Sequence, residues 1–476
     1  MEKKFIHVLS NGKGVLVLDL TIENVDKLQL NDFLRDDLKC NCGKNHSIEL
    51  EDVIVEEGAI RKIPDLLKKY KFKKVLVVSD THTYEAAGKL VAETLKKNNF
   101  DYKQFVFEVK EDLVPNEEAA GKLLIQTDED IDAIVTVGTG TLNDLSKFIS
   151  HKIGISSIVV GTAPSMDGFA SNGAALIVGN LKITYDATVP KAIIGDINVL
   201  KKSPKDMILA GFGDIVGKYS ALNDWKLSKV INKEYYCDVT VKMVENSLKK
   251  CVDNAKGIKN REPEAIKNLM EALILTGIAM SFVGNSRPAS GSEHHLAHYF
   301  EMMHLFENRK AILHGRKVGV NTVITRKLRE KLSNKDIDFD KAVSQAKAFD
   351  IDEWTQKVNS TFKEAASGII EISKKDETTS IEKRIQRINS IKEHEKEVKK
   401  ILKEVPSTEK IEEILIEAGA PTLPEQIGIK NESIFNAVLM SKEIRTRYTI
   451  LSLLSDLGLL EKFAHDVEKY LNEVSD

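Results

Sequence analysis

The sequence predicts an α/β nucleotide-binding domain over residues 1–200, followed by an all-α domain over residues 201–476. Three observations support this. A chain of 476 residues with 42% hydrophobic and 30% charged residues is long enough to form two cores. Apolar runs typical of strands alternate with helix-like stretches between residues 73 and 162. From Pro204 onward, helical periodicity continues almost to the end of the chain.

The first domain is predicted from a repeated order of strand and helix. The expected strands are KKVLVVSD (73–80), YKQFVFEV (102–109), IDAIVTVG (131–138) and SSIVVGT (156–162). Helix-like stretches at 81–97, 117–126 and 141–150 separate them, so parallel βαβ units are the natural assembly. Residues 181–200 surround Pro190 and are expected to form a hairpin or a sheet edge that closes the domain.

The charge pattern indicates what the protein acts on. A formal net charge of −3 gives no basic surface for nucleic acid, so a small-molecule substrate is favoured. The charged residues 371–404 carry both signs and are expected to form a solvated helix face. The first 20 residues lack a signal-peptide core and no membrane span is found, which predicts a cytoplasmic protein.

Cysteine usage fits a reducing compartment. The chain has four cysteines, too few for a disulfide framework at this length. The segment CNCGKNH places Cys40, Cys42 and His46 together, which could bind zinc. A fourth ligand is not evident and the spacing is not the usual one, so a structural or incidental role is the favoured interpretation.

An anion site is predicted where the strand 131–138 turns into a helix through GTGTLND. Gly138 and Gly140 permit close backbone approach, and free N–H groups at a helix start favour a pyrophosphate. The third glycine of the dinucleotide fingerprint is replaced by Asn143, so a plain strand-to-helix turn is the alternative. The next strand also ends in a polar loop, GTAPSMDGFASNGAAL, and two adjacent strand ends border one crevice. Asp80 ends the first strand, where it could bind ribose hydroxyls or cap a helix.

A metal site is predicted in the helical half. His294 and His298 are four residues apart and share a helix face, whereas His295 points about 100° away. His314 begins another helical stretch, and Asp214 precedes an apolar helix in which an unpaired carboxylate would be costly to bury. A carboxylate with two imidazoles suits Zn²⁺, Ni²⁺ or Fe²⁺ and leaves coordination open for substrate.

The motifs together resemble the sn-glycerol-1-phosphate dehydrogenase family, relatives of glycerol dehydrogenase, iron-type alcohol dehydrogenases and 3-dehydroquinate synthase. The resemblance rests on GTGTLND, GTAPSMDGFASNGA, PKAIIGDINVL, AGFGDIVGK, SRPASGSEHHLAHYFE, HGRKVGV, GAPTLPEQIGI and IRTRYTILSLLSDLGLL, in this order. It implies a dehydroquinate synthase-like fold. The CNCGKNHS opening and the long C-terminal part are similar to the bacterial branch, which implies NADH use, nickel or zinc, and a homodimer. NADP(H) is the alternative cofactor.

The resemblance also assigns residues. It makes Asp214, His294 and His314 the metal ligands, with Asp214 also near substrate, and it places His298 and Asp167 on the substrate. The implied cofactor contacts are Asp80, Gly138, Thr139, Gly140, Thr141, Leu142, Thr162, Ala163, Pro164, Ser165 and Ser171. The family often has GGGT where this chain has GTGT, so Thr139 narrows the approach of a phosphate.

The expected reaction is the interconversion of dihydroxyacetone phosphate and sn-glycerol 1-phosphate by hydride transfer with NAD(H). Asp214 and His298 are the expected catalytic residues, with His298 donating a proton or orienting the hydroxyl. Lys218, Arg287 and Arg316 are the candidates for binding the phosphate. The alternatives are a polyol dehydrogenase of the glycerol dehydrogenase type, a lyase of the dehydroquinate type, and a catalytically silent nucleotide- or metabolite-binding scaffold.

Overall fold

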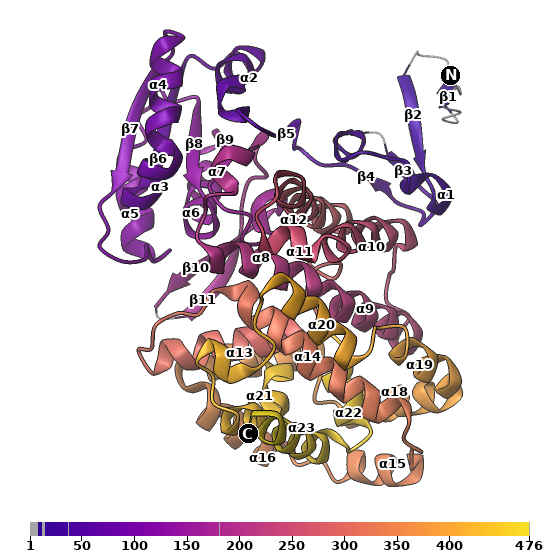
Figure 1. Cartoon of the computed structure of the whole chain (residues 1–476). Helices are drawn as coiled ribbons and strands as arrows, with labels where there is room; N and C mark the ends of the chain where they lie inside the picture. The colour runs from indigo at the N-terminus through magenta and orange to yellow at the C-terminus, as the bar shows by residue number, and fades with distance from the viewer. Residues whose placement is uncertain (1–7, 12–14, 37, 180, 476) are drawn as a thin grey trace. The chain divides into compact units, whose positions relative to one another are not determined.

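A computed structural model describes residues 8–11, 15–36, 38–179 and 181–475 and divides the chain into two compact units (Figure 1). The first unit comprises Met1–Gly211 and Cys237–Ser286, and the second comprises Phe212–Tyr236 and Arg287–Asp476. Residues 237–286, which the sequence analysis grouped with the helical half, thus pack with the first unit. The domain limits 1–200 and 201–476 stay a prediction.

The first unit contains a six-stranded sheet whose pairings are all parallel. Its strands, in spatial order, are β5 (Asp52–Glu56), β12 (Ala192–Asp196), β9 (Ser156–Gly161), β8 (Ala133–Gly138), β6 (Lys74–Asp80) and β7 (Asp101–Phe107). Every residue of β8 is buried, as expected for a strand covered on both faces. The predicted α/β architecture of this part of the chain is confirmed.

Helices cover both faces of this sheet, as the alternating side chains of β6 show. Val75 and Val77 point into a core shared with α2 (Ile63–Lys69) and α4 (Lys89–Lys97). Leu76 points into the opposite core, which contains residues of α5 (Glu117–Ile125) and α6 (Gly140–Ile153). Because successive side chains of a strand point to opposite faces, one apolar run serves both cores.

The expectation for residues 181–200 needs a correction. β10 (Gly173–Val178) and β11 (Leu181–Asp186) do form an antiparallel hairpin. The following β12 is not at an edge, however, because it pairs with β5 on one side and β9 on the other. All five residues of its AIIGD run are buried, which is typical of an interior parallel strand.

Helix α12 (Pro263–Val283) corrects the expectation that no segment resembles a membrane span. Among the described residues it is the one helix long and apolar enough to cross a membrane. However, 72% of its most apolar window is buried within the protein, as in the core helix of a soluble domain. It packs against α10 (Asp238–Val252) and against the 3-10 turn η4 (Gly168–Ala170).

Every element that the structure describes in the second unit is a helix, which confirms the prediction for this part of the chain. The helices that carry the candidate site are the C-terminal end of α8 (Lys205–Val216), α13 (Ser292–Phe306) and α14 (His314–Ser333). The charged segment 371–404 begins in α17 (Ala366–Asp376) and forms α18 (Ile381–Glu393) and α19 (Glu395–Leu402). Ile388 and Val398 bury the apolar faces of these two helices, so only their opposite faces are solvated.

Candidate functional site

Asp214, His294 and His314 meet in the second unit, although they come from three different helices. Asp214 lies near the end of α8, His294 in the first turn of α13, and His314 is the first residue of α14. One ligand atom from each lies within 4.8 Å of the other two. The distance from Asp214 Oδ1 to His294 Nε2 is 3.5 Å, and the rings of His294 and His314 have centroids 5.0 Å apart.

Glycines permit this convergence because they let α8 and α14 approach closely. A Cβ atom on Gly213 would lie 2.3 Å from the carbonyl oxygen of Gly315 and 3.3 Å from Cα of Gly319. Real Cβ atoms do not approach backbone so closely, so position 213 requires glycine. Gly213 precedes Asp214 and Gly315 follows His314, so the helix contact also sets the distance between these two ligands.

Two carboxylates orient the imidazoles from behind. Nδ1 of His294 donates to Glu293 Oε1 at 2.6 Å, and Nδ1 of His314 donates to Glu301 Oε1 at 2.7 Å. Each bond leaves Nε2 as the nitrogen that faces the group of three. Histidine ligands of metals typically have such a carboxylate partner, which fixes the tautomer and raises the basicity of the ring.

Buried charges determine the electrostatics of the group. Lys218 Nζ donates to Asp214 Oδ1 at 2.9 Å, and both side chains are fully buried. Burial alone would raise the pKa of Asp214, but the charge of Lys218 and the hydrogen bond with His294 hold it well below its usual range. Burial would lower the pKa of His294, whereas its hydrogen bonds with Asp214 and Glu293 raise it to about 9. An anionic carboxylate is therefore available beside the two rings.

The donor set fits a divalent transition metal. It offers one anionic oxygen and two imidazole nitrogens, which is fewer than the four ligands of a closed structural site. The carboxylates behind the rings supply the outer shell that such sites have. Asp214, His294 and His314 are thus the residues that could hold the ion, and they leave coordination positions for a substrate oxygen.

His298 lies beside this group and shares a carboxylate with it. Its Nδ1 donates to Glu301 Oε2 at 3.0 Å, while the other oxygen of Glu301 binds His314. The ring of His298 stacks on that of His314 at 5.4 Å. Burial and the charge of Arg445 hold the pKa of His298 well below its usual value, so the ring is neutral at pH 7. His295 is fully buried and is absent from both histidine groups.

Most of the residues expected to bind the cofactor lie at the ends of β8 and β9 in the first unit, whereas Asp80 ends β6 and Ser171 follows η4. Thr139 Oγ1 and Ser165 Oγ are 2.7 Å apart, and the Thr162 amide donates to the Gly138 carbonyl at 3.2 Å. A Cβ on Gly140 would meet nothing within 4 Å, so the start of α6 is open there. This open helix start, with its free N–H groups, can bind a phosphate.

Four of the expected cofactor residues have structural partners. Leu142 packs in the core against β6, and Ala163 is 1% exposed. Ser171 binds Nζ of the buried Lys147 at 3.1 Å, which holds its loop against α6. The Asp80 side chain accepts from the Thr83 amide at 2.7 Å and caps α3 (Thr81–Thr83), the second of the two roles expected from the sequence. Asp167 lies in the loop that precedes η4.

Two of the three phosphate candidates have other roles. Lys218 is paired with Asp214, and Arg287 Nε donates to Glu234 at 2.8 Å. Arg316 Nη2 donates to the Gln426 carbonyl at 3.5 Å. The sequence analysis missed Arg445, whose charge acts on both His295 and His298.

Two further site residues were missed, although the sequence contains a signal for each. Glu293 directly precedes a predicted ligand, and Glu301 follows His298 by three residues, one helical turn away on the same side. A search for carboxylates within a turn of each predicted histidine would have found both.

Comparison with known proteins shows which family the chain belongs to. The family of iron-containing alcohol dehydrogenases matches residues 54–204. The glycerol-1-phosphate dehydrogenase [NAD(P)+] of Geobacillus thermodenitrificans is 33% identical over 426 residues, 89% of this chain and 96% of that protein. The protein of the same name from Pyrococcus horikoshii is 34% identical over 57% of this chain and 77% of its own length.

Among solved structures, a probable glycerol dehydrogenase from Sinorhizobium meliloti has the same fold. It superimposes with a TM-score of 0.56 at 14% identity and covers 88% of this chain and 98% of that one. The fold class is thereby confirmed as that of the glycerol dehydrogenases and iron-containing alcohol dehydrogenases. Given a bacterial relative one-third identical over nearly its whole length, this chain belongs to the glycerol-1-phosphate dehydrogenase family.

Proposed function

We propose that this chain is an oxidoreductase that transfers hydride between NADH and dihydroxyacetone phosphate to give sn-glycerol 1-phosphate, and that it runs the reverse oxidation. The observation that carries the proposal is the convergence of Asp214, His294 and His314 in a chain that is 33% identical to a glycerol-1-phosphate dehydrogenase. Reduction consumes one NADH and one proton per ketone, so the chain must supply a route for that proton.

The ion is proposed to be nickel, zinc or iron(II). Held by Asp214, His294 and His314, it would act as a Lewis acid toward a substrate oxygen. Glu293 and Glu301 hold the two imidazoles in the orientation that this binding needs.

His298 is proposed to move the proton. Because Nδ1 donates to Glu301, the neutral ring carries its lone pair on Nε2. In the oxidation direction, Nε2 accepts the proton of the substrate hydroxyl, and the carboxylate of Glu301 stabilises the imidazolium that forms. In reduction the same nitrogen returns the proton. Asp167 is proposed as a further substrate contact.

The dinucleotide is proposed to bind at the ends of β8 and β9. The start of α6 would bind the pyrophosphate through the backbone of Gly140 and Thr141, and the hydroxyls of Thr139 and Ser165 would add hydrogen bonds. Asp80 favours NAD(H) over NADP(H), because its carboxylate would repel a 2′-phosphate.

Arg445 is proposed to bind the substrate phosphate. Its side chain is only partly exposed, and the resulting loss of hydration lowers its pKa despite the opposing charge of Glu301. A dianionic phosphate would offset that desolvation and could form a bidentate pair with the guanidinium. Arg445 would then set the preference for a phosphorylated substrate.

One paired assay tests the proposal. Protein stripped with a chelator is reloaded with Ni²⁺, Zn²⁺ or Fe²⁺, and NADH oxidation is followed with dihydroxyacetone phosphate and with dihydroxyacetone. The proposal requires metal-dependent oxidation with the phosphate ester at a kcat/KM at least a hundredfold above that with the free triose. Chiral analysis of the product must give the sn-1 ester.

The alternatives predict other results. Equal rates with both ketones would indicate a polyol dehydrogenase, and no oxidation of NADH with either would indicate a lyase or a silent scaffold. Arg445→Met should raise the KM for dihydroxyacetone phosphate far more than the KM for dihydroxyacetone. Because loss of this charge also raises the pKa of His298, any change in kcat should be the same for both ketones, so the difference in KM reports phosphate recognition. Homodimer formation is also part of the proposal and is tested by light scattering of the holoenzyme.

A further inference from the structure

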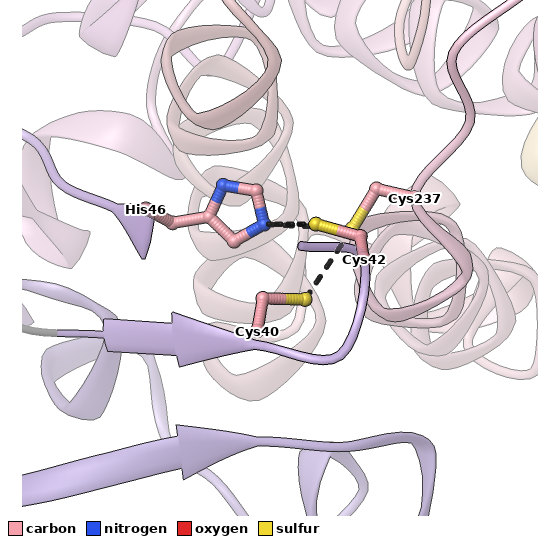
Figure 2. A group of neighbouring side chains, drawn as sticks. All are labelled: Cys40, Cys42, His46 and Cys237. Carbon is pink, nitrogen blue, oxygen red and sulfur yellow. Dashed lines mark hydrogen bonds between the residues drawn. The ribbon is translucent and has the colours of Figure 1, made fainter. Parts of the chain in front are cut away.

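Three of the four cysteines and one histidine meet in the first unit, outside the site described above (Figure 2). Cys40 ends β3 (Leu38–Cys40), Cys42 lies in the turn that follows, and His46 ends β4 (Asn45–His46). Cys237 immediately precedes α10. It is 191 residues away from His46 in the sequence. The fourth ligand that the CNCGKNH segment lacks is thus supplied by a distant part of the chain.

The distances within this Cys/His cluster fit a tetrahedral ion. The Sγ atoms of Cys40 and Cys237 are 3.7 Å apart, and Nε2 of His46 lies 3.5 Å from the Sγ atoms of both Cys42 and Cys237. A tetrahedral zinc with Zn–S of about 2.3 Å and Zn–N of about 2.0 Å separates two sulfurs by about 3.8 Å and a sulfur from a nitrogen by about 3.5 Å. One atom from each of the four residues lies within 4.8 Å of every other.

The histidine is oriented for ligation. Its Nδ1 donates to the Phe282 carbonyl at 3.1 Å, which fixes the tautomer and leaves the Nε2 lone pair facing the sulfurs. The ring also stacks on Phe282, with centroids 5.0 Å apart and an interplanar angle of 16°. His46 is 1% exposed, and its Nε2 contacts the thiols of Cys42 and Cys237.

The cysteines have the surroundings of metal-bound thiolates. The backbone amide and the hydroxyl of Thr240 donate to Cys237 Sγ at 3.4 and 3.1 Å. Cys237 also caps the N-terminus of α10, where the helix dipole favours a negative sulfur. The turn around Cys42 closes through a hydrogen bond from the Gly43 amide to the Cys40 carbonyl at 3.1 Å, with Gly43 at a φ of +86° that favours glycine.

We propose that Cys40, Cys42, His46 and Cys237 form a closed structural site for one zinc ion, separate from the Asp214, His294 and His314 group. Three thiolates and one imidazole leave no position for substrate, which distinguishes a structural from a catalytic zinc site. The ion binds the deprotonated thiols and the free Nε2 lone pair, and three protons leave to solvent. No oxidant or reductant is involved.

The site would anchor the N-terminal segment to the rest of the first unit. The described residues between 15 and 46 form only short elements, namely β2 (Val15–Leu20), α1 (Ile22–Val25), η1 (Leu30–Phe33), β3 and β4, and a small segment of this kind is often held in place by a covalent or metal link. The hydrogen bond from Asn246 Nδ2 to Asp26 Oδ1 at 2.7 Å, which also links this segment to α10, lies at the surface. Binding zinc joins β3 and β4 directly to α10.

Cobalt substitution tests the proposal and separates it from the catalytic metal. Full-length protein is prepared with a phosphine reductant, stripped and titrated with Co²⁺. Of the two proposed metal sites, only the Cys/His cluster has sulfur ligands. Thiolate-to-cobalt charge-transfer absorption in the near ultraviolet therefore reports this site and not the Asp214, His294 and His314 group. We expect this absorption in the wild type and in His294→Ala, and its loss in the double variant Cys40→Ser/Cys42→Ser. Zinc analysis of His294→Ala as purified should give one ion per chain.

Cys251→Ala is the matched control. Cys251 is a buried cysteine of the same unit that lies outside the cluster, so its replacement should leave the absorption unchanged. If the double variant does not fold, the spectra of the wild type and of His294→Ala still decide the question. Absence of the absorption in reduced wild-type protein would overturn the proposal. So would a Cys40–Cys237 disulfide found by mass spectrometry in protein purified without reductant.

Discussion

Glu301 binds two imidazoles with its two oxygens, His314 through Oε1 and His298 through Oε2. The ring of His314 belongs to the group that contains Asp214 and His294. The ring of His298 belongs instead to a second group, with Glu301 and His314. The carboxylate therefore links metal binding to proton transfer through one side chain. Two of the histidines of α13, His294 and His298, should consequently differ in what their removal abolishes.

Replacing each of these histidines by alanine tests that difference. His294→Ala removes a ligand, so metal content and turnover should be lost together. His298→Ala should keep the metal, while kcat falls by roughly 10²–10⁴-fold, the usual contribution of a positioned acid or base. Metal analysis beside steady-state kinetics measures both. A His298→Ala protein that is inactive because it lacks metal would contradict the assignment.

Metal uptake should also depend on pH through His294. The pKa of this ring is about 9 in the metal-free fold, against about 6.5 in an unfolded chain. The stability gained from the protonated ring is thus fully present below pH 6.5 and is lost as the pH rises through 9. A metal needs the neutral ring, so its affinity rises with pH over the same interval. We expect the increase in Tm on adding Ni²⁺ to grow from pH 6.5 to 9.

Glu293→Gln provides the comparison for this pH dependence. The substitution keeps a hydrogen-bond acceptor for Nδ1 of His294 but removes the negative charge that helps to raise its pKa. The growth of the Tm increase should then level off at a lower pH than in the wild type. Identical pH profiles in the two proteins would show that another group controls metal uptake.

At the scale of elements, the contact between α8 and α14 determines where two of the ligands lie. Gly213→Ala would place a methyl group against the Gly315 backbone, which can move only by shifting α14 and with it His314. We expect a loss of about 1–3 kcal/mol in the free energy of unfolding, as for other overpacked positions, together with weaker metal binding. Urea unfolding and metal titration measure the two effects.

Gly368→Ala is the control for that substitution. Gly368 lies in α17 (Ala366–Asp376) of the same unit, and a Cβ there would meet nothing within 4 Å. Because alanine favours a helix over glycine, this variant should gain about 0.5–1 kcal/mol and keep its metal affinity. If Gly213→Ala behaved in the same way, the close helix contact would not matter for the site.

Local sequence patterns predicted helices and strands correctly where a pattern is typical of a single kind of structure. The strands β6, β8 and β9 are apolar runs because both of their faces are buried, and the histidines of α13 have helical spacing. β12 was misplaced at an edge because nothing within its five residues encodes which strands lie beside it. Its neighbours β5 and β9 come from chain segments that precede it by about 140 and 36 residues, from Asp52 and Ser156 to Ala192.

At the scale of the whole molecule, contacts between residues that are distant in the sequence could not be predicted from local sequence patterns. Cys237 has no metal-ligand spacing of its own, so only the fold reveals it as a partner of Cys40, Cys42 and His46. Asp214, His294 and His314 are also distant in sequence, but the family resemblance supplied their relation. The same resemblance gave no role to the CNCGKNH segment, which is why its fourth ligand remained unidentified.

The two metal sites lie in different compact units, so each ion should stabilise its own unit. Local opening can be measured by hydrogen exchange, because amide protons exchange faster where structure opens more often. Cys40→Ser/Cys42→Ser should speed exchange in β3, β4 and the first turn of α10 and leave α13 and α14 unchanged. His294→Ala should do the reverse. Peptide-resolved mass spectrometry of both variants, each compared with the wild-type holoenzyme, distinguishes independent stabilisation from a single cooperative structure. Faster exchange in both units of either variant would show that the two sites stabilise one folding unit.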